Sequence, residues 1–272
     1  MGAAPSDPED RVLAPGATLR LVKRAAPVAA GTGAAIVLWW LLVTGLNVPD
    51  YLLPPPSQVV DVFRESPGYL LSNSWVTIVE IVLGLGVAIL FSVLWATLLV
   101  SVDVLRRAFL PLLVAAQSAP KEAMAPIFII WWGFSPLPKV AMAALVSFFP
   151  MLVATVVGLE RFTDQHRLLA ASMGAGPFQT FFKFRIWTAL PSFLGGVRLG
   201  VTLAVIGAVL GEYLGSDKGV GYVILGSSRR LDGGLLYASL ILLIVISWGL
   251  VALVDLLENR LLKGARAGRF VS

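Results

Sequence analysis

Residues 233–254 read GGLLYASLILLIVISWGLVALV, a stretch without Asp, Glu, Lys or Arg. An α-helix rises about 1.5 Å per residue, so about 20 apolar residues cross the roughly 30 Å hydrocarbon core of a bilayer. The whole chain shares this character: 57% of its 272 residues are hydrophobic, 14% are charged, and the mean hydropathy is +0.85. Soluble domains carry about 25% charged residues. The sequence therefore predicts an all-α, polytopic membrane protein.

Five other apolar runs are long enough to span a bilayer. Three of them are uncharged, at residues 25–49, 81–102 and 140–159. The other two are residues 108–138, interrupted by Lys121 and Glu122, and residues 186–211, interrupted by Arg198. The first run exceeds a signal-peptide core and no small-x-small cleavage site follows it, so we expect it to remain as the first span. The simplest prediction is about six transmembrane helices.

The basic residues indicate how the chain is threaded. With the N-terminus inside, fourteen of the 21 Lys and Arg residues fall on the cytoplasmic side, five fall outside and two lie within spans. Cytoplasmic loops are enriched in Lys and Arg, so both termini are expected in the cytoplasm. The predicted organisation is a tail at residues 1–24, a transmembrane domain at 25–262 with its longest cytoplasmic loop at 160–190, and a tail at 263–272. The net charge of +5 thus reports topology, with membrane lipid and not nucleic acid as the expected surroundings.

Catalytic and metal sites are not expected in this sequence. The chain has no cysteine and one histidine, His166, which excludes a thiolate cluster, a multi-histidine zinc site and a cysteine nucleophile. His166 lies in the inner loop with no nucleophile motif near it, and is most simply solvated. A Gly-x-x-x-x-Gly-Lys-[Ser/Thr] phosphate loop is also absent from the sequence. We therefore expect no cofactor in this chain.

The inner loop has a clear helix-break-helix pattern. Residues 167–173 are good helix formers, Gly174-Ala175-Gly176 breaks the helix, and Pro177 suits the first position of a second helix. We expect a helix-turn-helix at the cytoplasmic membrane surface. One face of the second helix is apolar, with Phe178, Phe181, Phe182 and Ile186. This face either packs beneath the protein's own helices and the lipid headgroups or docks a partner.

The inner loop, with the start of the next span, contains a sequence pattern similar to a known family motif. Residues 168–191, with Ala170-Ala171, Gly174-Ala175, Gln179-Thr180-Phe181 and Leu190-Pro191, resemble the cytoplasmic EAA loop of permease subunits in binding-protein-dependent ABC importers. Other similar stretches are Pro54-Pro55-Pro56-Ser57, Gln117-Ser118-Ala119-Pro120-Lys121, Ala125-Pro126, Trp132-Gly133-Phe134, Phe148-Phe149-Pro150 and Gly219-Val220-Gly221-Tyr222. Together they resemble the nitrate/sulfonate/taurine branch of that family.

The resemblance implies a type I ABC importer permease of the bacterial inner membrane. Such a permease passes a small solute delivered by an external binding protein: an organic or inorganic anion such as a sulfonate or nitrate, or a vitamin precursor. It implies a second permease copy, here expected as a homodimer, and a cytoplasmic ABC ATPase dimer that binds ATP and Mg²⁺. The residues expected to couple to the ATPase are Leu168, Ala170, Ala171, Gly174, Ala175 and Gly176.

Two signature residues of the family are missing from the loop. The usual acidic residue falls on Leu168, and the first proline of the usual pair falls on Trp187. The salt bridge that the acid would make to the ATPase is therefore absent. Glu160 or Asp164 is a neighbouring candidate to substitute for it.

The predicted fifth span carries small residues on one face. Gly196, Gly200, Ala204, Gly207 and Gly211 recur every three or four residues, which predicts close packing of another helix along this seam. The partner helix belongs either to the same subunit or to a second permease copy.

Charged residues within the spans are candidates for the translocation pathway. Intramembrane charges usually face a protein interior or water, which singles out Lys121, Glu122, Arg198 and Glu212, with Glu80 as a fifth. Other interpretations remain open for each of them. Lys121 and Glu122 are beside Pro120 at a possible helix break, Arg198 is within reach of the inner interface, and Glu212 is near the outer end of its span.

Two other classes of function are weaker interpretations of this sequence. An ion-coupled secondary transporter is expected to have matched halves with broken helices, and the sequence offers one broken helix and no matched half. An intramembrane enzyme needs paired carboxylates, a serine with a base, or histidine ligands at depth. The sequence therefore favours a permease without chemistry of its own.

Overall fold

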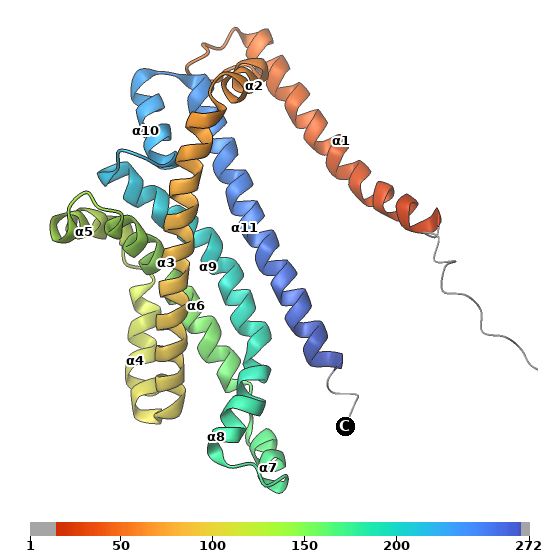
Figure 1. Cartoon of the computed structure of the whole chain (residues 1–272), viewed down its shortest axis with the longest axis vertical. Helices are drawn as coiled ribbons and strands as arrows, with labels where there is room; N and C mark the ends of the chain where they lie inside the picture. Colours follow the sequence, from red (N-terminus) through yellow and green to blue (C-terminus); the bar gives the residue numbers. More distant parts are fainter. Residues whose placement is uncertain (1–14, 268–272) are drawn as a thin grey trace, which may run out of the picture.

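The computed structural model describes the backbone of residues 15–267 and the side chains of residues 30–261. Within these residues every regular element is a helix, as the sequence predicts (Figure 1). The elements are α1 (Pro15–Leu46), α2 (Pro56–Glu65), α3 (Pro67–Ser101), α4 (Asp103–Ala116), η1 (Lys121–Met124), α5 (Ala125–Trp132), α6 (Leu137–Glu160), α7 (Asp164–Ser172), α8 (Pro177–Thr180), η2 (Phe181–Arg185), α9 (Ile186–Gly215), α10 (Val220–Arg230) and α11 (Gly233–Ala267). Part of each predicted tail, residues 1–14 and 268–272, lies outside the described residues.

Four helices among the described residues are long and apolar enough to cross a membrane. They are Pro67–Ser101, Leu137–Glu160, Pro177–Gly215 and Gly233–Leu261, and a shorter apolar helix lies at Ala30–Leu46. These segments match five of the predicted spans and confirm a polytopic, all-helical membrane protein. The first helix begins at Pro15, ten residues before the predicted span, and α3 begins at Pro67, so Glu80 is inside a span and not at its start.

The remaining predicted span, the third in chain order at residues 108–138, is not one continuous helix. It is divided between α4, a single 3₁₀ turn at η1 and the short helix α5. Pro120 explains the break, because proline has no N–H to donate and forces the preceding residue out of the helical region. The charged pair Lys121 and Glu122 occupies this 3₁₀ turn.

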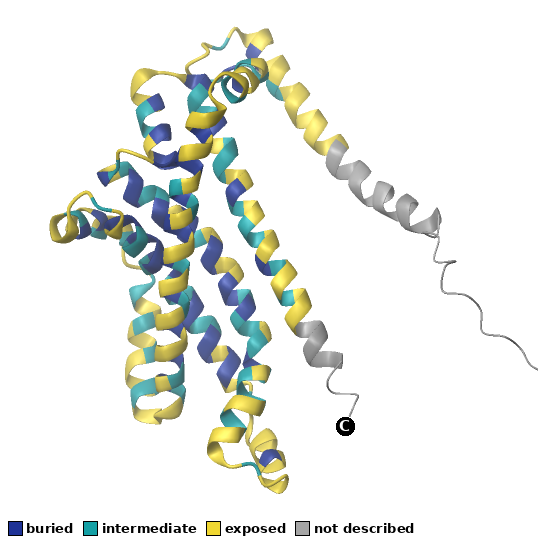
Figure 2. Ribbon diagram, in the orientation of Figure 1, coloured by how far each residue is buried: buried dark blue, intermediate teal, exposed yellow. Residues whose placement is uncertain are grey.

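The antiparallel helices α6 and α9 form the centre of the bundle, and α3 packs against both. Figure 2 shows most of the buried residues on these helices, whereas the described part of α1 is largely exposed and α11 carries buried, half-buried and exposed residues. Helix α1 diverges from the bundle, and its contact with α11 includes the rings of Trp39 and Tyr237, 6.0 Å apart (Figure 1). A lipid bilayer suits such exposed apolar faces, because hydrocarbon does not penalise them as water does.

The chain places different elements at the two ends of the bundle. Helices α2 and α10 lie at one end, and α7 and α8 lie at the other (Figure 1). Helix α2 begins at Pro56, the last residue of Pro54-Pro55-Pro56, because the fixed φ of proline suits the first position of a helix. Helix α10 was not predicted, because its sequence is rich in glycine and charge. From the predicted threading, we call the α2/α10 end outer and the α7/α8 end inner.

Candidate functional site

Helix α7 forms because local residues cap its first turn. Thr163 is the N-cap, and the Nδ1 atom of His166 accepts the Thr163 N–H at 3.2 Å and lies 2.8 Å from the Thr163 hydroxyl. The ring of His166 also stacks on Phe162 at a centroid distance of 5.5 Å. His166 is thus exposed, as expected, but it also has a structural role, because its side chain forms a capping box with Thr163 at the start of α7.

Glycine ends α7 as the sequence predicts. Gly174 has φ +74°, a left-handed conformation that residues with a Cβ adopt at a cost. The Gly174 N–H donates to Ala171 O at 2.9 Å, and the Ala175 N–H donates to Ala170 O at 3.0 Å. These two bonds form a Schellman motif, which satisfies carbonyl groups at the helix end.

The second helix of the loop is part of a membrane span. Pro177 begins α8, and the helical path continues through the π turn η2 into α9, so residues Pro177–Gly215 form one apolar helix. We expected a separate helix on the membrane surface, but α8, η2 and α9 follow one helical path, and Pro191 lies inside α9 without ending it. Any displacement of the turn at Gly174–Gly176 is therefore applied directly to a spanning helix.

The loop exposes apolar side chains that the rest of the chain leaves uncovered. Leu168 is 71% exposed, Leu169 58% and Met173 67%. Of the other predicted coupling residues, Ala171, Gly174 and Gly176 are exposed and Ala175 is half-buried. Ala170 is fully buried, so it supports α7 from within and has no surface for a partner. Apolar residues clustered on a surface are typical of an interaction site.

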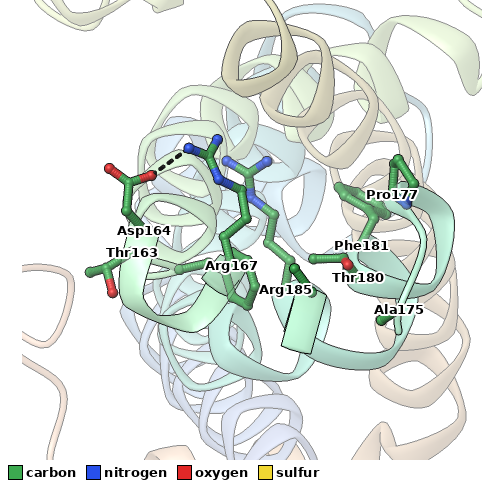
Figure 3. A pocket seen from close by; sticks show the side chains of 10 residues that line it. Thr163, Asp164, Arg167, Ala175, Pro177, Thr180, Phe181 and Arg185 are labelled. Atoms are coloured by element: carbon green, nitrogen blue, oxygen red, sulfur yellow. Dashed lines mark ion pairs between the residues drawn. The ribbon is translucent and has the colours of Figure 1, made fainter. Parts of the chain in front are cut away.

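A pocket of about 510 Å³ lies between α7 and the start of α8 (Figure 3). Its charged side chains are already engaged. Arg167 pairs with Asp164 at 2.9 Å, and Arg185 donates from Nε to the Leu159 carbonyl oxygen at 3.1 Å. The pocket therefore has one ion pair, Arg167 with Asp164, and one guanidinium, that of Arg185, whose described hydrogen bond is to a neutral carbonyl.

The two acidic candidates for the missing family residue differ in their surroundings. Glu160 accepts a hydrogen bond from Arg106, whose side chain also lies 3.7 Å from Asp103, so this carboxylate is engaged. The hydrogen bond and charge of Glu160 raise the pKa of Arg106 above its ordinary value. Asp164 has a side chain that is 85% exposed and lies beside Leu168 in α7. Both carboxylates are therefore paired with an arginine, and Asp164 is the more exposed of the two.

The four residues Lys121, Glu122, Arg198 and Glu212 are not brought together. Glu212 is buried near the outer end of α9, whereas Arg198 lies fourteen residues earlier, about 21 Å along the helix. Arg198 pairs with Asp255 and Glu258 of α11, at 3.0 Å for Glu258. Its charge is therefore balanced by another helix of the same chain.

Lys121 and Glu122 lie in η1, apart from Arg198 and Glu212 of α9. The Lys121 ammonium donates to Gln117 O at 3.3 Å and lies 5.6 Å from the centre of the Phe149 ring, a cation–π geometry. Glu122 is exposed. Both residues follow the helix break at Pro120, which favours the local structural interpretation of this pair.

Glu80 and Glu212 meet in a buried group that we call the outer polar cluster. Its side chains are Asn73, Thr77, Glu80, Lys139 and Glu212, all less than 7% exposed. The Lys139 ammonium lies 3.6 Å from the Glu80 carboxylate. The Thr77 hydroxyl donates to Glu212 at 2.6 Å, so helices α3, α6 and α9 are joined in one polar centre.

The outer polar cluster also receives the start of α10. The Gly219 N–H donates to Asn73 Oδ1 at 2.8 Å, the Val220 N–H donates to Thr77 Oγ1 at 2.8 Å, and the Gly221 N–H donates to Glu212. The first N–H groups of a helix have no partner within it, and here other helices supply the acceptors. A negative carboxylate is also favourable at this end of the helix dipole.

Glycine is required where the chain passes the Glu212 carboxylate. Gly219 has φ +105°, and a Cβ atom there would overlap the carboxylate oxygens. A Cβ at Gly221 would lie 2.7 Å from Glu212 Oε2. The Gly-Val-Gly sequence therefore lets the backbone N–H groups approach the buried acid.

The small-residue seam of α9 packs on α6 of the same chain. Added Cβ atoms would meet Ala154 at 2.6 Å from Gly196, Met142 O at 2.6 Å from Gly207, and Lys139 Cα at 2.8 Å from Gly211. Gly200 faces the Met151 side chain in the same way. Of the two interpretations of the seam, the structure favours packing within one subunit.

The sequence did not single out Lys139, Asn73 or Thr77. Lys139 was counted among the outer loop charges, but it lies in the first turn of α6 and is buried. A signal was available: Glu80 and Glu212 are two acids in apolar surroundings, and buried acids need a base and hydrogen-bond donors. Asn73 and Thr77 precede Glu80 at helical spacing, on the face that Glu80 occupies.

The fold and these sites define a multispan membrane transport subunit whose inner loop lies between two spans. Residues 88–266 match the family described as "Binding-protein-dependent transport system inner membrane component". The chain belongs to this family, whose members are type I ABC transporter permeases.

Named relatives cover most of the chain. It is 37% identical to the formylaminopyrimidine transport permease protein ThiX of Halalkalibacterium halodurans over 84% of this chain and 91% of the relative. It is 32% identical to the riboflavin transport system permease protein RibX of Chloroflexus aurantiacus, over 84% and 86%. It is 29% identical to the putative aliphatic sulfonates transport permease protein SsuC of Bacillus subtilis, over 85% and 84%. These relatives agree with the sulfonate/taurine-like branch that the sequence motifs indicate.

Proposed function

We propose that this protein is the permease of an ATP-driven importer and that it acts as a homodimer on a cytoplasmic ABC ATPase. In this role it forms the translocation pathway and leaves ATP and Mg²⁺ to the ATPase. An extracytoplasmic binding protein delivers the solute. Both termini lie in the cytoplasm, and the protein lies in the bacterial inner membrane.

The observation that carries this proposal is the uncovered helix α7. Its three large apolar side chains, Leu168, Leu169 and Met173, are more than half exposed, although the helix has its own caps and a buried support at Ala170. A helix with a rigid base and an apolar outer face fits the groove of a second protein. Because α8 continues into α9, movement of that protein would turn a spanning helix as a rigid body.

Relatives support a small solute as the cargo. The relatives named above are named for transport of a formylaminopyrimidine, riboflavin and aliphatic sulfonates. We propose that this chain carries a vitamin precursor or a small anion such as a sulfonate or nitrate. The binding protein makes the main selection among them.

Uptake by proteoliposomes tests the proposal. The permease is reconstituted with its co-purified ATPase and binding protein, and labelled riboflavin, a formylaminopyrimidine, taurine, an alkanesulfonate and nitrate are offered separately. We expect Mg·ATP inside the vesicles to drive accumulation of at least one solute. The permease without ATPase is the control. Accumulation driven by an ion gradient in that control would instead identify a secondary transporter.

A further inference from the structure

We propose that the outer polar cluster is the joint through which the outer surface and the inner loop move together. This inference rests on the importer function proposed above, and it gives the buried acids a role other than contact with solute. The cluster connects four helices at one point: Thr77 of α3, Lys139 of α6, Glu212 of α9 and the start of α10.

The hydrogen bonds of the cluster fix α10 to the spanning helices. Three consecutive N–H groups, from Gly219 to Gly221, donate to side chains of α3 and α9. These acceptors are buried, so a shift of α10 would leave polar groups unpaired in an apolar region, which is unfavourable. Helix α10 therefore moves together with α3 and α9.

An exposed turn connects the cluster to the outer surface. Ser216 lies between the end of α9 and the start of α10. Its hydroxyl forms hydrogen bonds with the backbone of Lys218, which closes a tight turn. Asp217 and Lys218 are exposed on this turn, two residues and one residue before Gly219. A protein that presses on this turn therefore pushes directly on the cluster.

The helix pair α6/α9 connects the cluster to the inner loop. Lys139 and Glu212 are near the outer ends of these helices, and α7 lies in the chain between the end of α6 at Glu160 and the start of α8 at Pro177, which continues through η2 into α9. Along their length the glycine seam brings α9 into close contact with α6, because a Cβ added at Gly196, Gly207 or Gly211 would overlap it. Closely packed helices move as units and not as continuously deformable bodies. The pair therefore acts as one rigid lever with the cluster at one end and α7 at the other.

Thr77 is the best residue for a test. Its hydroxyl bridges Val220 N–H and Glu212, and Thr77→Val removes both bonds while keeping the shape of the side chain. Thr155→Val is the matched control, because Thr155 is also buried in a span but its hydroxyl bonds only to Met151 O of its own helix. Asn73→Ala is a second variant, which removes only the acceptor for Gly219 N–H from the cluster.

The chain has no cysteine, so single labels can be attached without altering other positions. Spin labels at Asp217→Cys and at Ser172→Cys report the outer turn and α7 separately. The measurement is the electron paramagnetic resonance line shape of the permease–ATPase complex before and after addition of Mg·ATP. With the native cluster, or with Thr155→Val, we expect both labels to change mobility.

With Thr77→Val or Asn73→Ala we expect Mg·ATP to change the label on α7 and to leave the label on the outer turn unchanged. A response of both labels in these variants would overturn the inference, because the ends would then be connected without the cluster. Loss of both responses would also overturn it, because the cluster would then serve only stability. If neither label responds to Mg·ATP with the native cluster although the ATPase is bound, the proposed function as an ATP-driven importer permease fails.

Discussion

The two ends of the bundle satisfy their polar groups in different ways. At the outer end, acids, a lysine and three backbone N–H groups are buried and bind one another across four helices. At the inner end, the bonds of α7 are local, and its large apolar residues are left exposed. The buried polar groups of the outer end are therefore paired across helices, whereas at the inner end the polar groups of α7 are paired locally and its apolar side chains stay exposed.

Gly219 at the outer end and Gly174 at the inner end differ in the space around them. Gly219 and Gly174 both have positive φ angles, +105° and +74°. Gly219 is enclosed by the Glu212 carboxylate, but an added Cβ at Gly174 would meet nothing within 4 Å. At Gly219 both the backbone angle and the space require glycine. At Gly174 only the backbone angle does, which leaves that surface open to a partner.

The largest effect is expected from Lys139→Met. It leaves the buried Glu80 and Glu212 without their base, and removal of one member of a buried ion pair costs about 3–5 kcal/mol. Thermal unfolding in detergent measures this loss. The double variant Glu80→Gln/Lys139→Met removes both charges of the pair and should recover most of the stability. If the double variant is no more stable than Lys139→Met, the Lys139–Glu80 ion pair does not account for the stabilising effect of Lys139.

A smaller effect is expected from Gly207→Ala. The new methyl group would press on Met142 O and Ala143 Cα, which belong to the α6 backbone, and overpacking of this kind costs about 1–3 kcal/mol. Gly195→Ala is the control on the same helix, because it meets nothing within 4 Å. The melting temperature should fall only for Gly207→Ala, and the dimer fraction should stay constant. A loss of dimer with unchanged melting temperature would place the seam at a subunit interface instead.

Gly174→Ala should have a local effect at the inner end. A left-handed conformation costs a residue with a Cβ about 1–2 kcal/mol, so the end of α7 should open more often. Gly176→Ala is the control, since Gly176 has φ −69°. Hydrogen exchange of the Gly174 and Ala175 amides measures the opening. Equal exchange in the two variants would contradict the Schellman end of this helix.

The smallest effect on stability is expected from Leu168→Glu. The side chain is 71% exposed, and surface substitutions usually change stability by no more than about 0.5 kcal/mol. The variant restores the acidic residue that the family usually has at this position. We expect it to bind the ATPase more tightly in low salt than in high salt, because ionic contacts are screened. A salt-independent affinity would mean that no basic residue of the ATPase faces position 168.

The sequence alone predicted the parts of the fold that depend on local patterns. Apolar run length predicted five of the six expected spans, and Gly174 and Pro177 predicted the end of α7 and the start of α8, because these signals act within a few residues. Contacts between distant segments were not predictable in the same way. The cluster joins Thr77 to Glu212 and Asn73 to Gly219 across more than 130 residues, and no local pattern reports such a pairing.

Cross-linking from matched positions at the two ends tests the central claim, that the inner end binds a separate ATPase. Leu168 on α7 and Leu71 near the outer end of α3 are similarly exposed, 71% and 67%. A photoreactive amino acid replaces each in turn in the permease–ATPase complex. We predict a covalent permease–ATPase product from position 168 and none from position 71. A product from position 71, or none from position 168 while the ATPase co-purifies, would contradict the account.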